Sequence, residues 1–282
     1  MPVSDRSSPA SNNLRRRAQT VLWLAPLVVG AVLLLPTWAF ALFLGAAMLI
    51  AAWEWCGLAG ISGQAARRFY LAFIAATLAA LWHWSESSWP PLLLASLIWW
   101  IAQSLIIPRI RRIEPVEGPR PLLLITGLLI LASTWVALLS LHQIESRGPG
   151  LVLSLLILMA MADSAAYFVG RRWGRTKLAP TVSPGKTWAG AYGALAGAAL
   201  VGVLIAGWLG LAPLGVLAVV ILCILVAMLS IIGDLYESLL KRRRQLKDSS
   251  RLLPGHGGLL DRIDSLTAAA PLYALGMTWA LT

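Results

Sequence analysis

The sequence predicts an all-α, polytopic integral membrane protein with about nine transmembrane helices. Of its 282 residues, 59% are hydrophobic and 12% are charged, and the mean hydropathy is +0.76. That leaves too little polar surface to coat a soluble domain of this length. A helix crosses the hydrocarbon core with about 20 apolar residues, and the apolar runs here lack the alternation of barrel strands.

Five apolar runs make up the first half of the chain. They cover residues 21–35, 38–59, 69–84, 89–107 and 121–141. A polar, basic tail over residues 1–20 precedes them, and the first run lacks a small-residue cleavage site. We therefore expect a retained first span rather than a removed signal peptide, and an N-terminal transmembrane region of about five helices over residues 21–148.

Four further runs follow, at residues 150–170, 189–208, 212–232 and 266–281. The first, third and last of all the runs are short. Gly193 and Gly197 form a G-x-x-x-G pair that lets their helix pack closely on a neighbour. We expect a C-terminal transmembrane region over residues 149–282 that carries the chemistry, with polar loops at residues 171–188 and 234–265.

The basic residues give the orientation, because Lys and Arg collect in the cytoplasmic loops of multi-pass proteins. With nine spans, all but one of the 23 Lys and Arg residues fall on one side, the exception being Arg147. The prediction is a cytoplasmic N-terminus and an outer C-terminus. The net charge of +11 then describes a basic face against anionic lipid, not a nucleic-acid-binding surface. Cys56 and Cys223 lie in apolar runs. We expect them to be buried free thiols rather than a disulfide or a pair of metal ligands.

Acidic residues near the membrane are more telling, because topology does not require them and a carboxylate at a helix centre costs about 2.5–3.5 kcal/mol. Those at or near predicted membrane boundaries are Glu54, Asp163, Asp234, Asp261 and Asp264. Asp163, with Tyr167 and Gly170 on the same helix face, either lines a polar cavity or is satisfied by a neighbouring helix. For Glu54 the second alternative is favoured.

The end of the run at 212–232 carries a stripe of polar side chains. Asp234, Ser238 and Lys241 share one face of a continuing helix, a set suited to a metal-bound phosphate. The alternative is an ordinary helix end with a Glu237–Lys241 ion pair.

Beyond it, "LPGHGGLLDRID" gathers four turn residues around His256 and then begins a helix with Asp261 and Asp264 on one face. Glycines permit close backbone approach, and a helix N-terminus offers free N–H groups to an anion. The alternative is a plain re-entry turn.

The loop at 171–188 contains "GKT", but a P-loop needs Gly five residues before Gly185, where Pro180 stands, so that interpretation fails. Ser183, Lys186 and Thr187 remain as phosphate contacts, or as part of a basic loop that only obeys topology. Carboxylates, cations and hydroxyls at one membrane face together indicate phosphoryl or nucleotidyl transfer to a lipid.

The segment from Ser238 to Asp264 resembles the signature of the phosphatidate cytidylyltransferases, also called CDP-diacylglycerol synthases. The matching residues are Ser238, Leu239, Leu240, Lys241, Arg242, Lys247, Asp248, Ser250, Leu253, Pro254, Gly255, His256, Gly257, Gly258, Asp261, Arg262, Ile263 and Asp264. The segment from Asp163 through "SPGKTWAG" is similar too, except that Ala189 stands where family members often carry a polar or acidic residue. The resemblance is clear from about residue 160 onward and general before it.

The resemblance implies transfer of CMP from CTP to phosphatidic acid with Mg2+, and room for a second cation, in the bacterial cytoplasmic (inner) membrane with the site facing the cytoplasm. It implies metal ligation by Asp234, Asp261 and Asp264. The implied catalytic residues are Lys241, Lys247, Asp248 and His256, and the implied phosphate contacts are Ser183, Lys186, Thr187, Ser238, Arg242 and Arg262. A homodimer among membrane lipids is expected from the family alone.

Two other functions compete with this one. A CTP-dependent lipid kinase would use comparable chemistry but leave CDP instead of pyrophosphate. A transporter or an anionic-lipid-binding scaffold would explain the basic face and the intramembrane acids. However, the two halves of the chain do not contain the matching pair of interrupted apolar runs that is typical of transporters.

Overall fold

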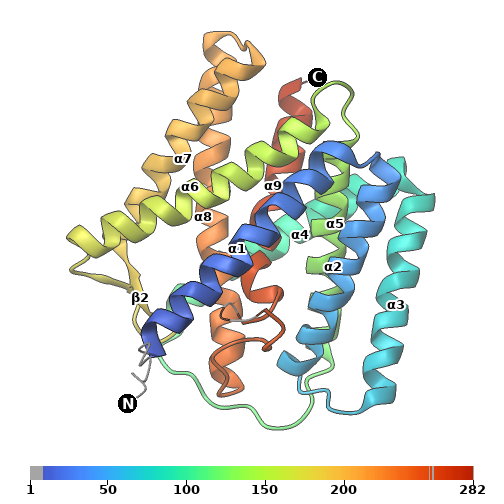
Figure 1. The fold of residues 1–282 in the computed structure, drawn as a ribbon, viewed down its shortest axis with the longest axis vertical. Coiled ribbons are helices and arrows are strands. Elements are labelled where there is room, and N and C mark those ends of the chain that lie inside the picture. Colours follow the sequence, from blue (N-terminus) through green and yellow to red (C-terminus); the bar gives the residue numbers. More distant parts are fainter. Residues whose placement is uncertain (1–8, 254, 256, 282) are drawn as a thin grey trace, which may run out of the picture.

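The computed structural model describes residues 9–253, 255 and 257–281. Within these residues each predicted apolar run forms one α-helix (Figure 1). The helices are α1 (Pro9–Leu34), α2 (Thr37–Leu58), α3 (Gln64–His83), α4 (Ser85–Ile106), α5 (Leu122–His142), α6 (Gly148–Trp173), α7 (Trp188–Leu209), α8 (Pro213–Arg243) and α9 (Leu260–Leu281). A short 3-10 helix, η1 (Ile107–Arg109), follows α4.

Seven of these helices are long and apolar enough to cross a membrane, namely α2 to α8. The apolar part of α1, Leu22–Leu34, is shorter. The first turns of α9 carry Asp261, Arg262 and Asp264, which lower its apolar character. The multi-pass, all-helical class is therefore confirmed, and the count of nine spans stays a prediction.

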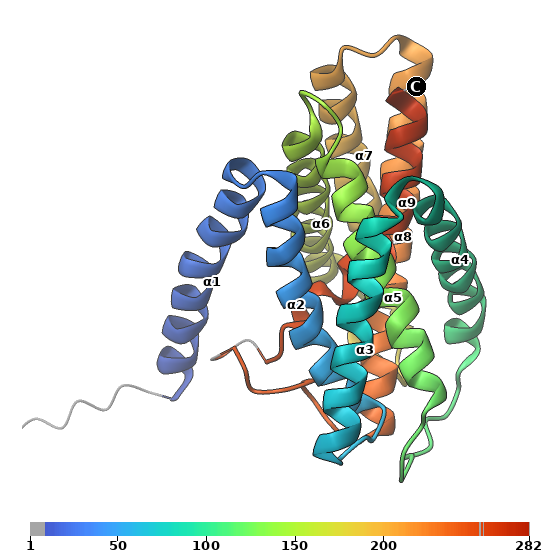
Figure 2. The ribbon, with the colours of Figure 1, turned by 90° about the vertical axis from the view of Figure 1, so that its right-hand side faces the viewer.

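The connections rich in basic residues gather at one end of the bundle. The start of α1, the α2–α3 turn, the segment before α5 and the α8–α9 connection lie toward that end, whereas the C-terminal end of α9 lies at the other (Figure 1). Viewed from the side, α1 leans away at the edge of the bundle (Figure 2). The orientation of the protein in the membrane stays a prediction from the basic residues.

α5 lies at the centre and is the most buried of the candidate spans. It packs against α2 and α3 on one side and against α9 on the other, with α7 and α8 beyond α9 and α6 crossing obliquely (Figure 1). The close packing predicted for Gly193 is confirmed, because a Cβ there would meet Val169 Cβ at 2.7 Å on α6. At Gly197 a Cβ would meet Ala165 Cβ at 3.0 Å.

A β-hairpin that the sequence did not predict joins α6 to α7. Its strands, β1 (Lys177–Ala179) and β2 (Ser183–Thr187), pair antiparallel with Lys177 opposite Thr187. Val182, in the turn, is buried. β2, which carries Lys186, lies against α8.

α8 is 31 residues long, or about 46 Å at 1.5 Å per residue. A hydrocarbon core of about 30 Å is shorter than that, so the last turns of α8 reach beyond it. The chain then returns through residues 244–259, here called the α8–α9 connection, to start α9 at Leu260.

Candidate active site

A cavity of about 480 Å3 lies between α6, the hairpin, α7 and α8, and we call it the charged cavity. The charged side chains in its walls are Asp163, Arg171, Lys177, Lys186 and Asp234. Of the two alternatives left open for Asp163, the structure shows the cavity wall, and Tyr167 and Gly170 line the same wall. In the sequence, Arg171 and Lys177 contribute only to the predicted membrane orientation. Nothing in their spacing distinguishes a phosphate-binding residue from a basic residue of a cytoplasmic loop.

Lys186 and Asp234 meet in this cavity. Lys186 Nζ lies 2.7 Å from Asp234 Oδ2, and the two side chains are 24% and 34% exposed. Ser238, one turn further along α8, donates its hydroxyl to Asp234 Oδ1 at 3.2 Å. The structure thus brings together three of the predicted site residues, from a loop and a helix about 50 residues apart.

Thr187 serves mainly as the N-cap of α7. Its side-chain oxygen accepts the Gly190 N–H at 3.1 Å, and the residue is buried. An N-cap of this kind satisfies one of the free N–H groups of the first helical turn. Thr187 also lines the charged cavity, so a phosphate contact remains a proposal beside the capping role.

A second polar cluster lies further along α8. Lys241 Nζ is 2.6 Å from Asp261 Oδ1 and 3.3 Å from Glu237 Oε1. The Lys241 and Asp261 side chains are only 12% and 4% exposed. The Glu237–Lys241 pair weighed as an alternative therefore exists, and it exists together with the contact to Asp261. The ammonium of Lys241 ties α8 to α9.

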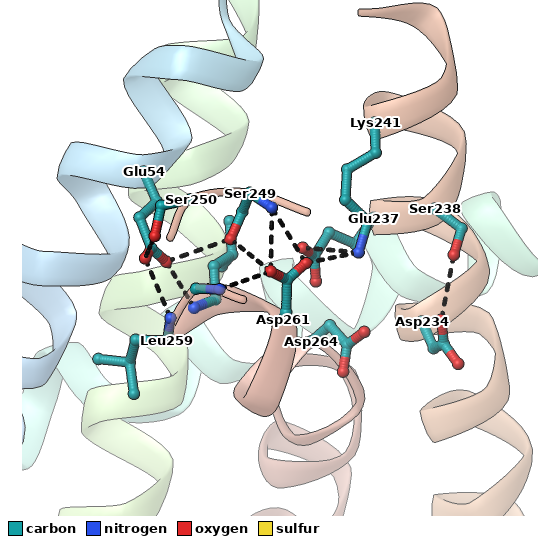
Figure 3. A network of polar contacts seen from close by, with 12 residues as sticks. Glu54, Asp234, Glu237, Ser238, Lys241, Ser249, Ser250, Leu259, Asp261 and Asp264 are labelled. Atoms are coloured by element: carbon teal, nitrogen blue, oxygen red, sulfur yellow. Dashed lines mark hydrogen bonds and ion pairs between the residues drawn. The ribbon is translucent and has the colours of Figure 1, made fainter. Parts of the chain in front are cut away.

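Asp261 accepts hydrogen bonds from four donor groups (Figure 3). Besides Lys241, these are the Ser249 N–H at 2.9 Å, the Ser249 hydroxyl at 2.9 Å and the Gly258 N–H at 2.7 Å. A carboxylate has about four lone-pair sites. A metal ion could bind Asp261 only by displacing one of these donors.

Glu54, on α2, is satisfied by a neighbouring element, which is the alternative that the sequence favoured. The side chain reaches into the α8–α9 connection and accepts from the Leu259 N–H at 3.0 Å and the Leu260 N–H at 2.6 Å. The Ser250 hydroxyl donates to Glu54 Oε1 at 2.5 Å. The available signal was a carboxylate between two Trp residues in an apolar run, and the sequence could not say which segment it would meet.

Two carboxylates in the walls of the charged cavity, Asp163 and Asp234, lie near a third, Asp264. Asp234 acts as a like charge on both Asp163 and Asp264, and Figure 3 shows Asp264 on α9 directed toward α8. Hard oxygen ligands suit Mg2+, and a cation between like charges relieves their repulsion. The donor chemistry fits magnesium. In the described part of the chain, however, no group of three or more acidic, His or Cys side chains is close enough to hold an ion.

Other predicted residues are not brought into the charged cavity. Arg242, Lys247 and Asp248 are exposed at the end of α8 and in the α8–α9 connection. Ser183 starts β2 opposite Ala179. Helical and motif spacing predicts which residues share a face, but the direction of that face depends on packing. His256 lies outside the described residues.

Apolar cavities flank the charged one. A cavity of about 590 Å3 between α1, α2, α6 and the start of α9 shares Asp163 and Ser265 with it and is also lined by Arg262. On the other flank, a cavity of about 510 Å3 shares Leu178, Ala191 and Ile231. The arrangement can hold a molecule that is anionic at one end and apolar at the other.

Known proteins are similar in sequence to this chain, two of them over most of its length. The model of the cytidylyltransferase family matches residues 15–279. A Pseudomonas aeruginosa protein named phosphatidate cytidylyltransferase is 43% identical over 267 residues, covering 95% of this chain and 97% of that protein. A Haemophilus influenzae protein of the same name is 33% identical over 281 residues, covering 93% and 97%. A Brucella suis protein of that name is 47% identical over 137 residues, covering 48% and 50%.

Proposed function

The chain belongs to the cytidylyltransferase family, and we propose that it transfers the CMP group of CTP to phosphatidic acid, giving CDP-diacylglycerol and pyrophosphate. Two relatives aligned over nearly their whole lengths carry the name phosphatidate cytidylyltransferase. The names of these relatives support both substrates.

The junction of the charged cavity with the apolar cavity between α1, α2 and α6 carries the proposal. Asp163 and Ser265 line both. Phosphatidic acid has an anionic phosphate next to two acyl chains, so its headgroup suits the charged cavity and its chains suit the apolar one. Lys186, Arg171 and Lys177 supply the positive charge that phosphate oxygens require.

The reaction is a single displacement at phosphorus. A phosphate oxygen of phosphatidic acid attacks the α-phosphorus of CTP, the new P–O bond forms, the bond to the β-phosphate oxygen breaks, and pyrophosphate leaves. Because the attacking oxygen is already ionised, no strong general base is needed. The protein contributes mainly positioning and charge neutralisation.

Within this scheme the residues divide by what they touch. Lys186, fixed by the hairpin and by Asp234, binds phosphate oxygens in the charged cavity. Lys241, held between Glu237 and Asp261, positions the first turn of α9 rather than reaching the cavity. Magnesium, when bound, would neutralise phosphate charge and orient the triphosphate. We assign Asp234 and Asp264 to hold it, with Asp261 orienting the helix that carries Asp264.

The location of the site follows from the basic residues. We propose that the protein lies in the cytoplasmic membrane with the α8–α9 connection and the hairpin facing the cytoplasm, where CTP is available. Exposed apolar side chains on the outer helix faces, such as Leu217 and Ile221 on α8, then face lipid.

The test is pyrophosphate release by the purified, detergent-solubilised protein given CTP, phosphatidic acid and Mg2+, with each left out in turn. The expected result is release that requires all three and matches the CDP-diacylglycerol formed. CDP without pyrophosphate would replace the proposal with a lipid kinase. Neither product, from protein shown to be folded, would point to a transporter or scaffold.

A further inference from the structure

We propose that Glu54 is a positioning residue, which fixes the α8–α9 connection and, through it, the carboxylate of Asp261. The kinetic part of this inference rests on the proposed function, whereas its structural part does not. Glu54 lies on α2, outside the C-terminal region that carries the other site residues.

The surroundings of Glu54 are built to hold a carboxylate. The residue is 2% exposed, and none of the ion pairs between described residues includes it. A buried charge without a cation must be compensated by hydrogen bonds. Here the N–H groups of Leu259 and Leu260 supply them at the start of α9, where the helix dipole also favours a negative charge.

Ser249 connects Glu54 to Asp261. Its hydroxyl lies 2.9 Å from Asp261 Oδ2 and 3.4 Å from Glu54 Oε2, so its single hydrogen can serve either carboxylate. The Ser249 N–H donates to Asp261 as well. The two carboxylates thus hold opposite sides of the same short segment (Figure 3). Moving Glu54 would move both Ser249 and the first turn of α9.

The glycines of the connection show how closely it is packed on this carboxylate. A Cβ at Gly258 would meet Ser249 Oγ and would lie 2.5 Å from Glu54 Oε1. Gly257 has a positive φ of 80° and would place a Cβ 2.6 Å from Asp261 Oδ2. A side chain at Gly258 therefore cannot be accommodated unless Glu54 or Ser249 moves.

The same end of α2 also holds the other end of the connection. Arg244 Nε donates to Leu58 O at 2.8 Å, and Leu58 is one helical turn after Glu54. The α8–α9 connection is therefore anchored to α2 at both its first residue and its last. α2 therefore helps to set the position of Asp261, in addition to its place as a membrane-spanning helix.

The experiment compares the full-length protein with Glu54→Gln and Glu54→Asp, and with Glu145→Gln as the matched control, since Glu145 is an exposed glutamate between α5 and α6. Glu54→Gln keeps the volume and loses the charge, whereas Glu54→Asp keeps the charge and shortens the reach. Hydrogen exchange of peptides covering residues 249–261 reports the connection directly. kcat and KM for CTP, per folded protein, report the site.

For Glu54→Gln we expect exchange in this segment to be faster by about tenfold. We expect kcat to be lower by about tenfold or more, with KM for CTP within about threefold, because a small misplacement of reacting groups acts mainly on the transition state. Glu54→Asp should fall between, and Glu145→Gln should match the unaltered protein. A residue that only fills space would leave Glu54→Gln unchanged in both measurements, and that result would overturn the proposal.

Two further outcomes, a variant that does not fold and a protein without the proposed activity, can be told apart from a failure of this proposal. If Glu54→Gln does not fold, Ser249→Ala and Ser250→Ala replace it, and unchanged exchange in both would reject the link to Asp261. If the unaltered protein makes no CDP-diacylglycerol, the proposed function fails, while the exchange measurement still decides whether Glu54 fixes the connection.

Discussion

The ammonium of Lys186 lies 2.7 Å from a carboxylate oxygen of Asp234, which joins the hairpin to α8 in the wall of the charged cavity. Both side chains are partly exposed, so the pair is weakly stabilising, at about 1 kcal/mol or less. A contact that contributes so little to the free energy of folding, placed in a cavity with other cations, is better suited to holding a lysine ready for an anionic substrate.

Lys186→Ala should therefore reduce activity far more than stability. We expect kcat/KM to fall by about 10²–10³, the usual loss when one group that stabilises developing charge is removed, and the midpoint of thermal unfolding to change by only a few degrees. The control is Arg175→Ala, at an exposed arginine just before the hairpin. Equal losses in both variants would mean that the basic loop acts only through its overall charge.

Magnesium binding should depend on Asp264, which faces the like charge of Asp234. A chelator should abolish activity and added Mg2+ should restore it. Asp264→Asn should raise the Mg2+ concentration for half-maximal activity by about tenfold or more. Mg2+ should also raise the thermal midpoint of the unaltered protein and raise that of Asp264→Asn less. Glu117→Gln, at an exposed acid, is the control. An unchanged magnesium response in Asp264→Asn would exclude Asp264 as a ligand.

Much of this architecture could be predicted because the bilayer leaves few choices. Helix positions follow from apolar run lengths, and the pairing of Lys241 with Glu237 follows from an i,i+4 spacing. The sequence predicted that the two polar loops share one membrane face, and the contact of Lys186 with Asp234 agrees with that, although no spacing paired these two residues. These features depend on local periodicity and on sidedness, which a single sequence contains.

Glu54 illustrates what a single sequence does not contain. It meets Leu260 across 206 positions of the chain, a contact set by how α2 packs against α9 and by no local pattern. Likewise, the hairpin has strands of only three and five residues, too short for an alternation signal. Lys247 matches a motif position but is exposed. A motif predicts which residue type stands at a position, but it does not predict where that side chain points.

Gly258→Ala should disturb the α8–α9 connection through space alone. The added Cβ would overlap Ser249 Oγ and crowd Glu54 Oε1, and overpacking of this kind costs about 1–3 kcal/mol of unfolding free energy. Activity should fall with it, because Asp261 depends on Ser249. The matched control is Gly207→Ala in α7, where nothing lies within 4 Å of the new Cβ and a small gain in helix stability is expected. Denaturation in detergent and the pyrophosphate assay measure both effects. Equal stability of the two variants would contradict the crowding argument.

Arg244 provides the last prediction, because its guanidinium binds three backbone carbonyls at once. It donates to Leu58 O at 2.8 Å, Val116 O at 2.9 Å and Gly118 O at 2.7 Å, joining the end of α2 to the segment before α5. Burial, and then the charge of Arg120, lower the pKa of this guanidinium, yet an arginine stays protonated at neutral pH.

Arg244→Lys cannot reproduce that geometry, since a lysine offers one ammonium on a flexible stem and loses its proton more readily where burial opposes charge. Carbonyls left without a donor cost about 1–3 kcal/mol. We therefore expect Arg244→Lys to lower the free energy of unfolding by about that amount, whereas Arg243→Ala, at the exposed neighbour, should change it by about 0.5 kcal/mol or less. Thermal denaturation of the solubilised proteins at pH 7 measures the difference. A lysine variant as stable as the arginine protein would mean that charge alone, and not the three directed hydrogen bonds, holds the end of α8 against α2.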